Sequence, residues 1–405
     1  METLTKKKKI MILGGDDKSI PVIETAIKCG YEVILCDYND KLKSIKLANK
    51  FYCVSVFDED RIKEIGKKEE VDGVISYSSD KIAYVANKVA RELNLTLNPP
   101  ESIEILIKKD KFRKFLKDNN FNVPKAIATK NIDENIIKSV LNFQFPIMVK
   151  PTDSAGSSGV TKINSINELK KAFEFAKLNS QSQNVIIEEY IEMNHECMIA
   201  GDAFVYQGQV KFFGFLNSHR GLKNHPFIPT GTSYPFYMND KINEIKETIQ
   251  KVITDLKIDN CPLNLELMYG KDGKLYIIEI APRNGGNLIP RIILDTYGVD
   301  LFKALVMSAV GDIPDLEEKD QIKFATTYVV KSDKDGILKN IEFDKIIKDK
   351  IYREVYYKNI GDEILSFDRA NKAIGIIFLK FESQDEEDNI IKSIEKYINI
   401  EFENK

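Results

Sequence analysis

One lysine and the loop that follows it form the clearest chemical pattern in the chain. Lys150 ends the short apolar segment 146–149, and soon after it comes the run Ser154-Ala155-Gly156-Ser157-Ser158-Gly159. Because few side chains stand in the way, backbone N–H groups of this run could close over a polyphosphate while Lys150 neutralises its oxygens. A polar hairpin loop between two ordinary strands is the alternative interpretation.

Lys111 is a second candidate for phosphate binding, on a segment with helical periodicity. Phe112, Phe115 and Leu116 form the apolar stripe of this expected helix and leave Lys111 beside the core face. Together with Lys150 it could clamp a second phosphate. Alone it would be one more solvated lysine.

The apolar residues 185–187 run directly into Glu188-Glu189-Tyr190-Ile191. The end of such a buried strand can offer backbone donors and acceptors to the edge of an adenine ring, while apolar side chains line the base pocket. Glu196 follows, and its oxygens could accept hydrogen bonds from ribose hydroxyls. A strand with polar ends is the plainer interpretation.

Glu266 and Glu279 form the strongest pair in the chain. Each lies among apolar neighbours in one of two strands joined by the turn 270–273, which predicts a hairpin. Two such carboxylates would repel each other unless a cation lay between them. Mg²⁺ prefers carboxylate and phosphate oxygens, so the pair predicts a Mg–ATP site, with Mn²⁺ as an alternative ion. Two independent surface acids are the other interpretation.

Arg283 follows Glu279 on the same strand, and a turn with Asn284, Gly285 and Gly286 comes next. The guanidinium is suited to a carboxylate or an anionic intermediate, and the glycines let a ligand approach the backbone. An interdomain salt bridge is the alternative role for Arg283.

The segment 217–235 is the candidate for substrate choice, because it combines two histidines, cations and prolines in a loop-like setting. His219 or Arg220 could contact a substrate or the γ-phosphate. A stiff surface connection would have the same composition.

The elements that must position these residues fall into three stretches. Residues 1–100 alternate strands (9–13, 32–36, 51–54, 73–76) with helices, which predicts a doubly wound parallel α/β domain. Gly14-Gly15 and Asp37 invite a nicotinamide-dinucleotide interpretation, but the chain has no G-x-G-x-x-G.

Residues 101–311 mix strands and helices of the α+β type and contain all the candidate chemistry. Residues 312–405 predict a small C-terminal α+β domain, with strands at 324–330 and 373–381 and a last helix near 390–397.

Composition excludes several classes of protein. The net charge of −3 over 405 residues disfavours nucleic-acid binding, and no apolar run is long enough to span a membrane. The five scattered cysteines predict neither disulfides nor a zinc site, and three histidines leave little room for histidine chemistry. With no signal peptide recognised, we expect a cytoplasmic protein.

In the order of these motifs the chain resembles the ATP-grasp superfamily over nearly its whole length. The resemblance implies a pre-ATP-grasp α/β domain, two α+β subdomains that clamp ATP, and a small C-terminal domain. It further implies that Lys111 and Lys150 hold phosphates, that the 154–159 loop closes over them, and that the 188–191 hinge, with Met268, binds adenine. By the same resemblance Glu196 binds ribose, and Glu266 and Glu279 bind Mg²⁺.

One position departs from the family pattern. Many members have Asn two residues after the second metal-binding glutamate, and here Ala281 stands there, so the third ligand is missing or comes from Asn284 or a substrate phosphate. The sequence IEIAPRNGG is most similar to the branch that joins carboxylates to amines, which includes bacterial L-amino-acid ligases.

This branch implies an ATP-dependent ligase that forms an amide through an acyl phosphate. Arg283 and Lys150 are then the catalytic residues, small carboxylates and amines the substrates, and a homodimer the expected assembly. A formate-using or carboxylase-type ATP-grasp enzyme, a nicotinamide-dependent oxidoreductase and a non-catalytic nucleotide-binding regulator are the alternatives.

Overall fold

The N-terminal part of the chain is a parallel sheet with helices on both faces. A computed structural model describes residues 6–77, 79–96, 98–222, 225–319 and 321–403. Strands β1–β4 have the order β3-β2-β1-β4 and pair in parallel. The apolar runs of β1, β2 and β4 are buried on both faces, with α1 packing on one face and α2 and α3 on the other. The elements are β1 (Lys9–Leu13), α1 (Ile20–Lys28), β2 (Glu32–Asp37), β3 (Lys50–Cys53), α2 (Glu59–Glu69), β4 (Gly73–Ser76) and α3 (Asp80–Glu92).

A small antiparallel sheet carries Lys150 and the Gly/Ser loop. Its order is β5-β8-β6-β7, and its apolar face packs on α6 and α7. Two helices, α4 and α5, connect it to the N-terminal sheet. The elements are α4 (Pro100–Ile107), α5 (Lys109–Asp118), β5 (Ala126–Thr129), α6 (Glu134–Val140), β6 (Ile147–Pro151), β7 (Thr161–Ile163), α7 (Leu169–Leu178) and β8 (Val185–Glu189).

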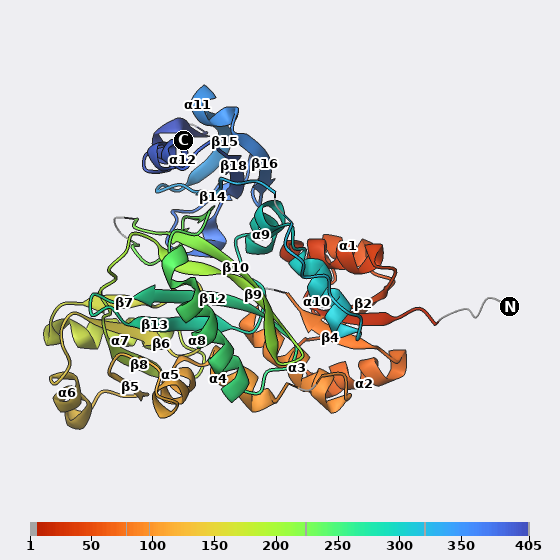
Figure 1. Ribbon diagram of the computed structural model, residues 1–405, viewed down its shortest axis with the longest axis horizontal. Coiled ribbons are helices and arrows are strands. Elements are labelled where there is room, and N and C mark those ends of the chain that lie inside the picture. Colours follow the sequence, from red (N-terminus) through yellow and green to blue (C-terminus); the bar gives the residue numbers. More distant parts are fainter. Residues whose placement is uncertain (1–5, 78, 97, 223–224, 320, 404–405) are drawn as a thin grey trace.

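An eight-stranded antiparallel sheet forms the centre of the molecule, in the order β13-β12-β9-β10-β11-β14-β18-β16 (Figure 1). Its first five strands carry the candidate acids and Arg220. The elements are β9 (Met198–Tyr206), β10 (Gln209–His219), β11 (Gly231–Tyr234), α8 (Ile242–Asp255), β12 (Cys261–Tyr269), β13 (Leu275–Ala281), α9 (Ile289–Tyr297) and α10 (Leu301–Ala309).

The C-terminal segment completes this sheet and adds a layer on it. Strand β14 pairs with β11, so the hydrogen-bonded sheet runs across the expected boundary at residues 311/312. A three-stranded sheet β17-β15-β19 lies beyond it (Figure 1, top). The elements are β14 (Ala325–Val330), β15 (Gly336–Phe343), α11 (Lys345–Lys348), β16 (Ile351–Tyr356), β17 (Glu363–Ile364), β18 (Gly375–Lys380), α12 (Gln384–Ile391) and β19 (Ile398–Phe402).

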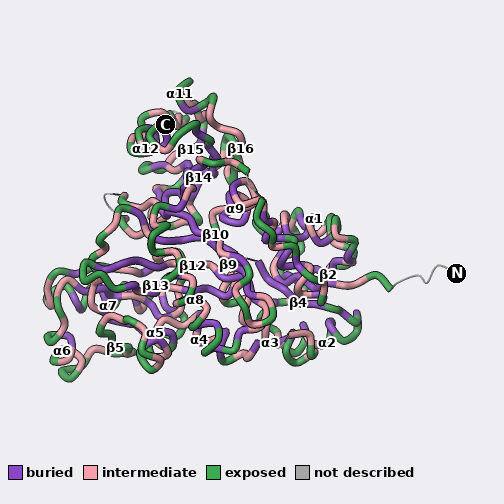
Figure 2. Tube along the Cα trace, viewed as in Figure 1, coloured by how far each residue is buried: buried purple, intermediate pink, exposed green. Residues whose placement is uncertain are grey.

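The structure confirms the expected fold class and corrects one C-terminal element. The helix expected near 390–397 is α12, which ends at Ile391, followed by the 3-10 turn Ile394–Tyr397. Buried positions follow the strands of the central sheet, whereas exposed ones follow the outer helices (Figure 2). None of the helices in the described ranges is long and apolar enough to cross a membrane.

Candidate active site

Lys150 lies in a buried ion-pair network at the end of β6. Because Met148 is the cross-strand partner of Glu188, the Lys150 ammonium reaches the Glu188 carboxylate. Arg113 of α5 donates to the same carboxylate over 3.1 Å. Burial alone would raise the pKa of Glu188, but Lys150 and Arg113 outweigh it and hold this pKa at about 2. Glu188 is therefore a carboxylate that positions Lys150.

The rest of the expected hinge joins the small sheet to the central one. The Tyr190 N–H donates to the Pro146 carbonyl over 3.1 Å, and the Glu189 carboxylate accepts from the Gln144 N–H over 2.8 Å. Ile191 is half-buried in this connection, and Met268 is buried on β12. Glu196 lies just before β9, at the rim of a cavity described below.

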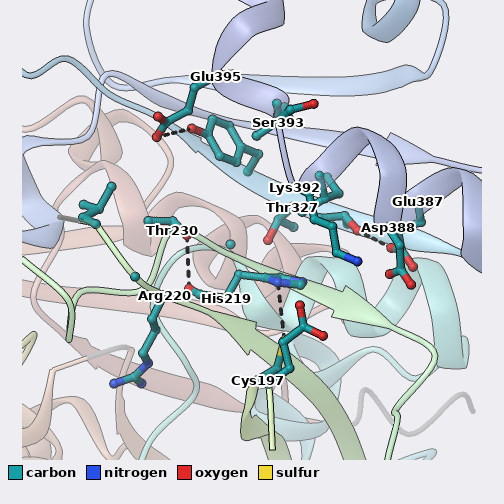
Figure 3. A pocket seen from close by; sticks show the side chains of 18 of the residues that line it. Cys197, His219, Arg220, Thr230, Thr327, Glu387, Asp388, Lys392, Ser393 and Glu395 are labelled. Carbon is teal, nitrogen blue, oxygen red and sulfur yellow. Dashed lines mark hydrogen bonds between the residues drawn. The ribbon is translucent and has the colours of Figure 1, made fainter.

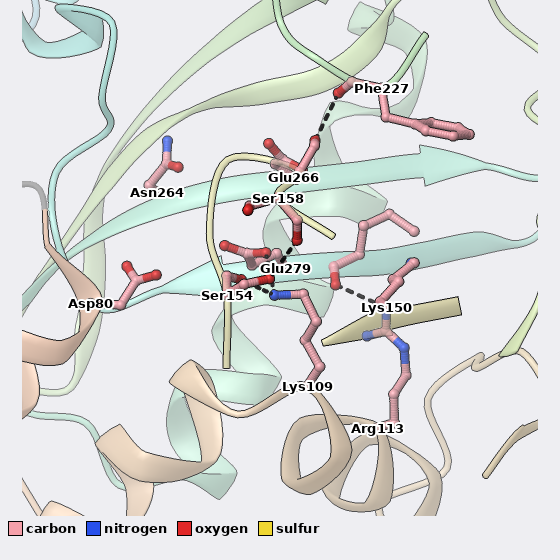
Figure 4. Close-up of polar contacts among 12 residues, drawn as sticks. Asp80, Lys109, Arg113, Lys150, Ser154, Ser158, Phe227, Asn264, Glu266 and Glu279 are labelled. Atoms are coloured by element: carbon pink, nitrogen blue, oxygen red, sulfur yellow. Dashed lines mark hydrogen bonds and ion pairs between the residues drawn. The ribbon is translucent and has the colours of Figure 1, made fainter. Parts of the chain in front are cut away.

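A second lysine beside the acid pair is Lys109, which the sequence analysis did not single out, and phosphate binding by Lys111 stays a prediction. The Lys109 ammonium donates to the Ser154 carbonyl over 2.6 Å and lies 3.6 Å from Glu279 (Figure 4). Lys111 instead pairs with Glu104 at 2.7 Å and is 44% exposed. Residues two apart on a helix lie on nearly opposite sides, so only one of the two lysines can face the cleft.

The Gly/Ser loop already spans the cleft. The Ser157 hydroxyl donates to the Phe227 carbonyl over 3.1 Å, and Ser154 donates to the Ser158 carbonyl over 2.9 Å. Ser158 itself donates to Asn179 over 3.0 Å. Gly156 and Gly159 have φ angles of +62° and +74°, which glycine adopts without strain.

Glu266 and Glu279 are direct cross-strand partners on β12 and β13. Arg220 donates to Glu266 over 2.7 Å, and Lys109 approaches Glu279 from the other side. The same hairpin pairs Ala281 with Asn264. The amide absent at position 281 is thus present on the neighbouring strand, where its oxygen accepts from Arg283 over 3.0 Å.

These two acids fit a magnesium ion bound together with phosphate. Within the described ranges no three His, Cys, Asp or Glu residues cluster as a metal site. Mg²⁺ commonly uses one or two carboxylates, with waters and substrate phosphates as its other ligands. Glu266 and Glu279 would hold it, and Arg220 and Lys109 show that their oxygens attract cations.

Arg283 forms the interdomain salt bridge that we considered and also borders the acid pair. Its Nε donates to Asp80, at the start of α3, over 2.7 Å. Its Nη1 donates to Asn264 and to the Asn284 carbonyl, each over 3.0 Å. Burial lowers the pKa of Arg283, but Asp80 and Glu279 outweigh it, so the net pKa is raised.

Asp202 is a functional candidate that sequence reasoning missed. Its carboxylate is fully buried on β9 and accepts from the Gly285 N–H over 2.8 Å and from Asn264 over 2.9 Å. Burial raises its pKa to about 6 despite these donors. Asn284 also points toward Asp202, at 3.5 Å, whereas Gly286 faces open space. The signal was an acid in an otherwise apolar strand.

His219 and Arg220 diverge from the end of β10 (Figure 3). Arg220 reaches Glu266 and the Phe227 carbonyl, over 3.0 Å for the latter, and its Nε is buried without a hydrogen bond. The His219 ring turns to the other side, 3.5 Å from the Cys197 sulfur. Lys223 and Asn224 of the expected specificity segment lie outside the described residues.

In the nicotinamide interpretation of the N-terminal domain, Asp37 would accept hydrogen bonds from a ribose. The structure shows that this carboxylate already has partners within its own turn. The Asp37 carboxylate accepts from the Gly15 N–H over 2.9 Å and from the Asn39 N–H over 2.9 Å. It is 91% buried (9% exposed) and stabilises its own glycine turn, so it is not displayed to a ribose.

The fold and this set of acids, lysines and arginines are those of the ATP-grasp class. Residues 143–291 match the family described as ATP-grasp domain. This segment of the chain is therefore similar to ATP-grasp domains, as the motifs predicted.

The chain is also similar to curated proteins, each over part of that protein's length. The large chain of carbamoyl phosphate synthase from Pseudothermotoga lettingae is 26% identical over 76% of this chain and 28% of its own length. The formate-dependent phosphoribosylglycinamide formyltransferase of Prochlorococcus marinus subsp. pastoris is 27% identical over 47% of this chain and 49% of its own. The chain thus spans half or less of these two relatives.

Solved structures are similar over nearly the whole chain. Phosphoribosylglycinamide synthetase from Anaerococcus prevotii is 25% identical with a TM-score of 0.76, covering 98% of this chain and 100% of that one. L-amino acid ligase from Bacillus licheniformis is 19% identical with a TM-score of 0.81, covering 99% and 100%. At 19% identity, the similarity to the L-amino acid ligase is a similarity of fold.

Proposed function

We propose that this protein is an ATP-dependent carboxylate–amine ligase that releases ADP and phosphate. The observation that carries the proposal is the cross-strand pair Glu266 and Glu279, with Arg220 and Lys109 each within 4 Å of one acid. Two opposed carboxylates suit a magnesium ion, and the two cations beside them suit the phosphate oxygens of a triphosphate, because each group is opposite in charge to the ligand it would bind.

In this proposal the cations bind and orient the triphosphate. Lys150, held by Glu188, and Lys109, at the mouth of the 154–159 loop, would bind phosphate oxygens, and Arg220 would leave Glu266 for the γ-phosphate. The loop would exclude water from the reacting groups. Magnesium, when bound, supplies further neutralisation of phosphate charge.

The reaction needs two bond exchanges. A substrate carboxylate oxygen bonds to the γ-phosphorus while the bond to the ADP oxygen breaks, which gives an acyl phosphate. An amine nitrogen then bonds to the acyl carbon, phosphate leaves with the electron pair of the broken C–O bond, and the nitrogen loses a proton. Charge stabilisation and positioning dominate such chemistry.

We assign to Arg283 the role of binding the anionic acyl group. The Asp80 and Asn264 bonds hold the guanidinium beside the strand that carries Glu279, so little reorganisation is needed when charge develops. Amino acids or similar small carboxylates are the proposed substrates. A homodimer and a cytoplasmic location remain predictions.

A formate-using or carboxylase-type enzyme is the second candidate. The formate-dependent relative supports it, as do solved N5-carboxyaminoimidazole synthetases of similar fold, such as that from Staphylococcus aureus at 17% identity and a TM-score of 0.75. This candidate shares the ATP site and differs only in the acyl donor.

ADP release separates the candidates. The assay supplies Mg–ATP and a panel of carboxylates, including formate and bicarbonate, each with and without a panel of amines. ADP formed only with both an amino-acid carboxylate and an amine supports the ligase. ADP formed with formate or bicarbonate supports the second candidate, and no ADP from any pair, with ATP bound, contradicts both.

A further inference from the structure

A cavity of about 460 Å³ lies between the end of β10 and helix α12, and apart from Glu196 and Arg220 the proposed ligase chemistry does not use the residues that line it. Its wall includes His219 and Thr327 from the central sheet and Glu387, Asp388 and Lys392 from α12 and the turn after it. Figure 3 shows these side chains converging from the two sides.

The cavity extends past the end of β10, where Glu196 and Arg220 also line it. Successive side chains of a strand point to opposite faces, and Arg220 points to Glu266. The neighbouring His219 therefore points away from Glu266, and Figure 3 shows it directed toward Lys392 and Asp388. The part of the cavity between His219 and α12 therefore has a lining of its own, separate from the side chains that contact the acid pair.

Two adjacent carboxylates in the cavity have neutral partners. Glu387, 1% exposed, accepts from the Thr326 hydroxyl and from the Gln384 amide over 2.8 Å. Asp388 accepts from Gln384 over 3.0 Å and from Tyr237 over 3.4 Å. Within the described part of the chain neither has a Lys or Arg nitrogen within 4 Å, and burial raises the pKa of Glu387 to about 7, so a cationic group from outside would stabilise the ionised pair.

The facing side of the cavity offers groups for an anion. Lys392 forms no ion pair with the residues that the structure describes, and its ammonium lies between His219 and Asp388 in Figure 3. The Nε2 atom of His219 is buried and has no hydrogen-bond partner among those residues. A carboxylate could accept from both.

We propose that this cavity is a second ligand site for a free α-amino acid. The ammonium of the ligand would contact Glu387 and Asp388, and its carboxylate would contact Lys392 and His219. A metal ion fits less well, because the Lys392 ammonium lies beside the two carboxylates and would repel a cation. Arg220 follows His219 directly in the chain. The proposed amino-acid site is therefore next to the end of β10, where Arg220 belongs to the proposed nucleotide site.

Isothermal titration calorimetry on the full chain tests the site. L-alanine and L-glutamine are the probes, with ethylamine and acetate as single-charge controls, and each titration is repeated with saturating Mg–ADP. Asp388→Asn and Lys392→Met remove the two charges, and Lys392→Met changes an exposed residue, so it should not impair folding. Asp385→Asn, exposed on the same helix, is the matched control.

We expect saturable binding of an amino acid, weakened at least about tenfold by Asp388→Asn and by Lys392→Met and unchanged in Asp385→Asn or with Mg–ADP. Arg283→Ala should leave this binding intact even if it abolishes ligase turnover. The site is contradicted if no amino acid binds, if binding survives both charge removals, or if Arg283→Ala abolishes it, since the last result places the ligand at the reaction centre.

Discussion

At the scale of single residues, the candidate active site contains pairs of opposite charge. In the proposed function, some of these charged groups exchange partners when ligands bind. Lys150 is paired with Glu188 in a buried position, whereas Lys109 approaches Glu279 and Arg220 approaches Glu266. The Lys150–Glu188 pair fixes the position of the Lys150 ammonium. The other two cations can move to phosphate oxygens, because their acids would then be neutralised by magnesium.

Lys109→Met should reduce ADP release by about 10²- to 10³-fold, since the removal of one charge-stabilising donor in a closed site typically costs about 3 kcal/mol. Lys111→Met is the matched control on the same helix and should stay within a few-fold of wild type. Equal losses in the two variants, measured as kcat with Mg–ATP, would contradict the assignment of Lys109.

Arg283→Ala should lower kcat to a similar degree, about 10²-fold or more, with a smaller effect on the KM for ATP. Arg283→Lys keeps the charge but loses the forked geometry, so it should recover only part of the activity. Turnover of Arg283→Ala within a few-fold of wild type would exclude the proposed role at the acyl group.

Asp202 gives a pH dependence of stability with a defined sign. Its pKa is raised to about 6 in the fold, so the native state binds the proton more tightly than the unfolded chain does. The free energy of unfolding should therefore fall by about 3 kcal/mol as the pH rises from below 4 to above 6, relative to Asp202→Asn, which does not titrate. Urea unfolding of both proteins at a series of pH values measures this difference. A constant difference across the range would show that Asp202 titrates normally.

At the scale of elements, the turn after β13 joins the acid pair to helix α9. A Cβ at Gly285 would lie 2.7 Å from Asp202, Asn264 and Ile289 atoms, whereas a Cβ at Gly286 would meet no atom within 4 Å. The turn is thus fixed on one side by Asp202 and open on the other.

Gly285→Ala should destabilise the protein by about 1–3 kcal/mol, because the packed atoms around the turn must move. Gly286→Ala should change the free energy of unfolding by less than about 0.5 kcal/mol. Thermal unfolding of the two variants provides the comparison, and equal stability would show that the turn relaxes without cost.

Periodicity was enough to predict the elements with long apolar runs. The expected strands 9–13 and 73–76 coincide with β1 and β4, because such runs can only be buried strands. The signal for Lys109 was also present, since it lies three residues before Phe112 on the same helical face. The acid in the apolar segment 198–206 was a signal for Asp202, but its partners could not be predicted, because they come from β12 and from the turn after β13. The short, half-exposed strands β15 and β17 have no such pattern.

At the scale of the whole molecule, the three stretches expected from the sequence are joined by a salt bridge and by a common hydrophobic core. Arg283 and Asp80 link the central sheet to the N-terminal one, and one apolar core contains Ile12 of β1, Ile293 of α9 and Phe378 of β18. The expected domain boundaries stay predictions, but this core crosses both of them.

A chain that ends at residue 311 should therefore be poorly soluble. It would lack β14, β18 and β16, leaving β11 as an open sheet edge beside uncovered apolar residues. Size-exclusion chromatography against the full chain measures the effect. A monodisperse truncated protein with cooperative unfolding would show that the C-terminal segment is an independent unit.

One carbonyl oxygen joins the Gly/Ser loop to Arg220. Phe227 accepts both the Ser157 hydroxyl of the Gly/Ser loop and the Arg220 guanidinium. Both bonds use the backbone, so they do not depend on the identity of the side chain at position 227. Such a position can drift freely during evolution while its place in space is conserved. Sequence comparison would overlook it, and a deletion or insertion nearby would be far more damaging than any substitution.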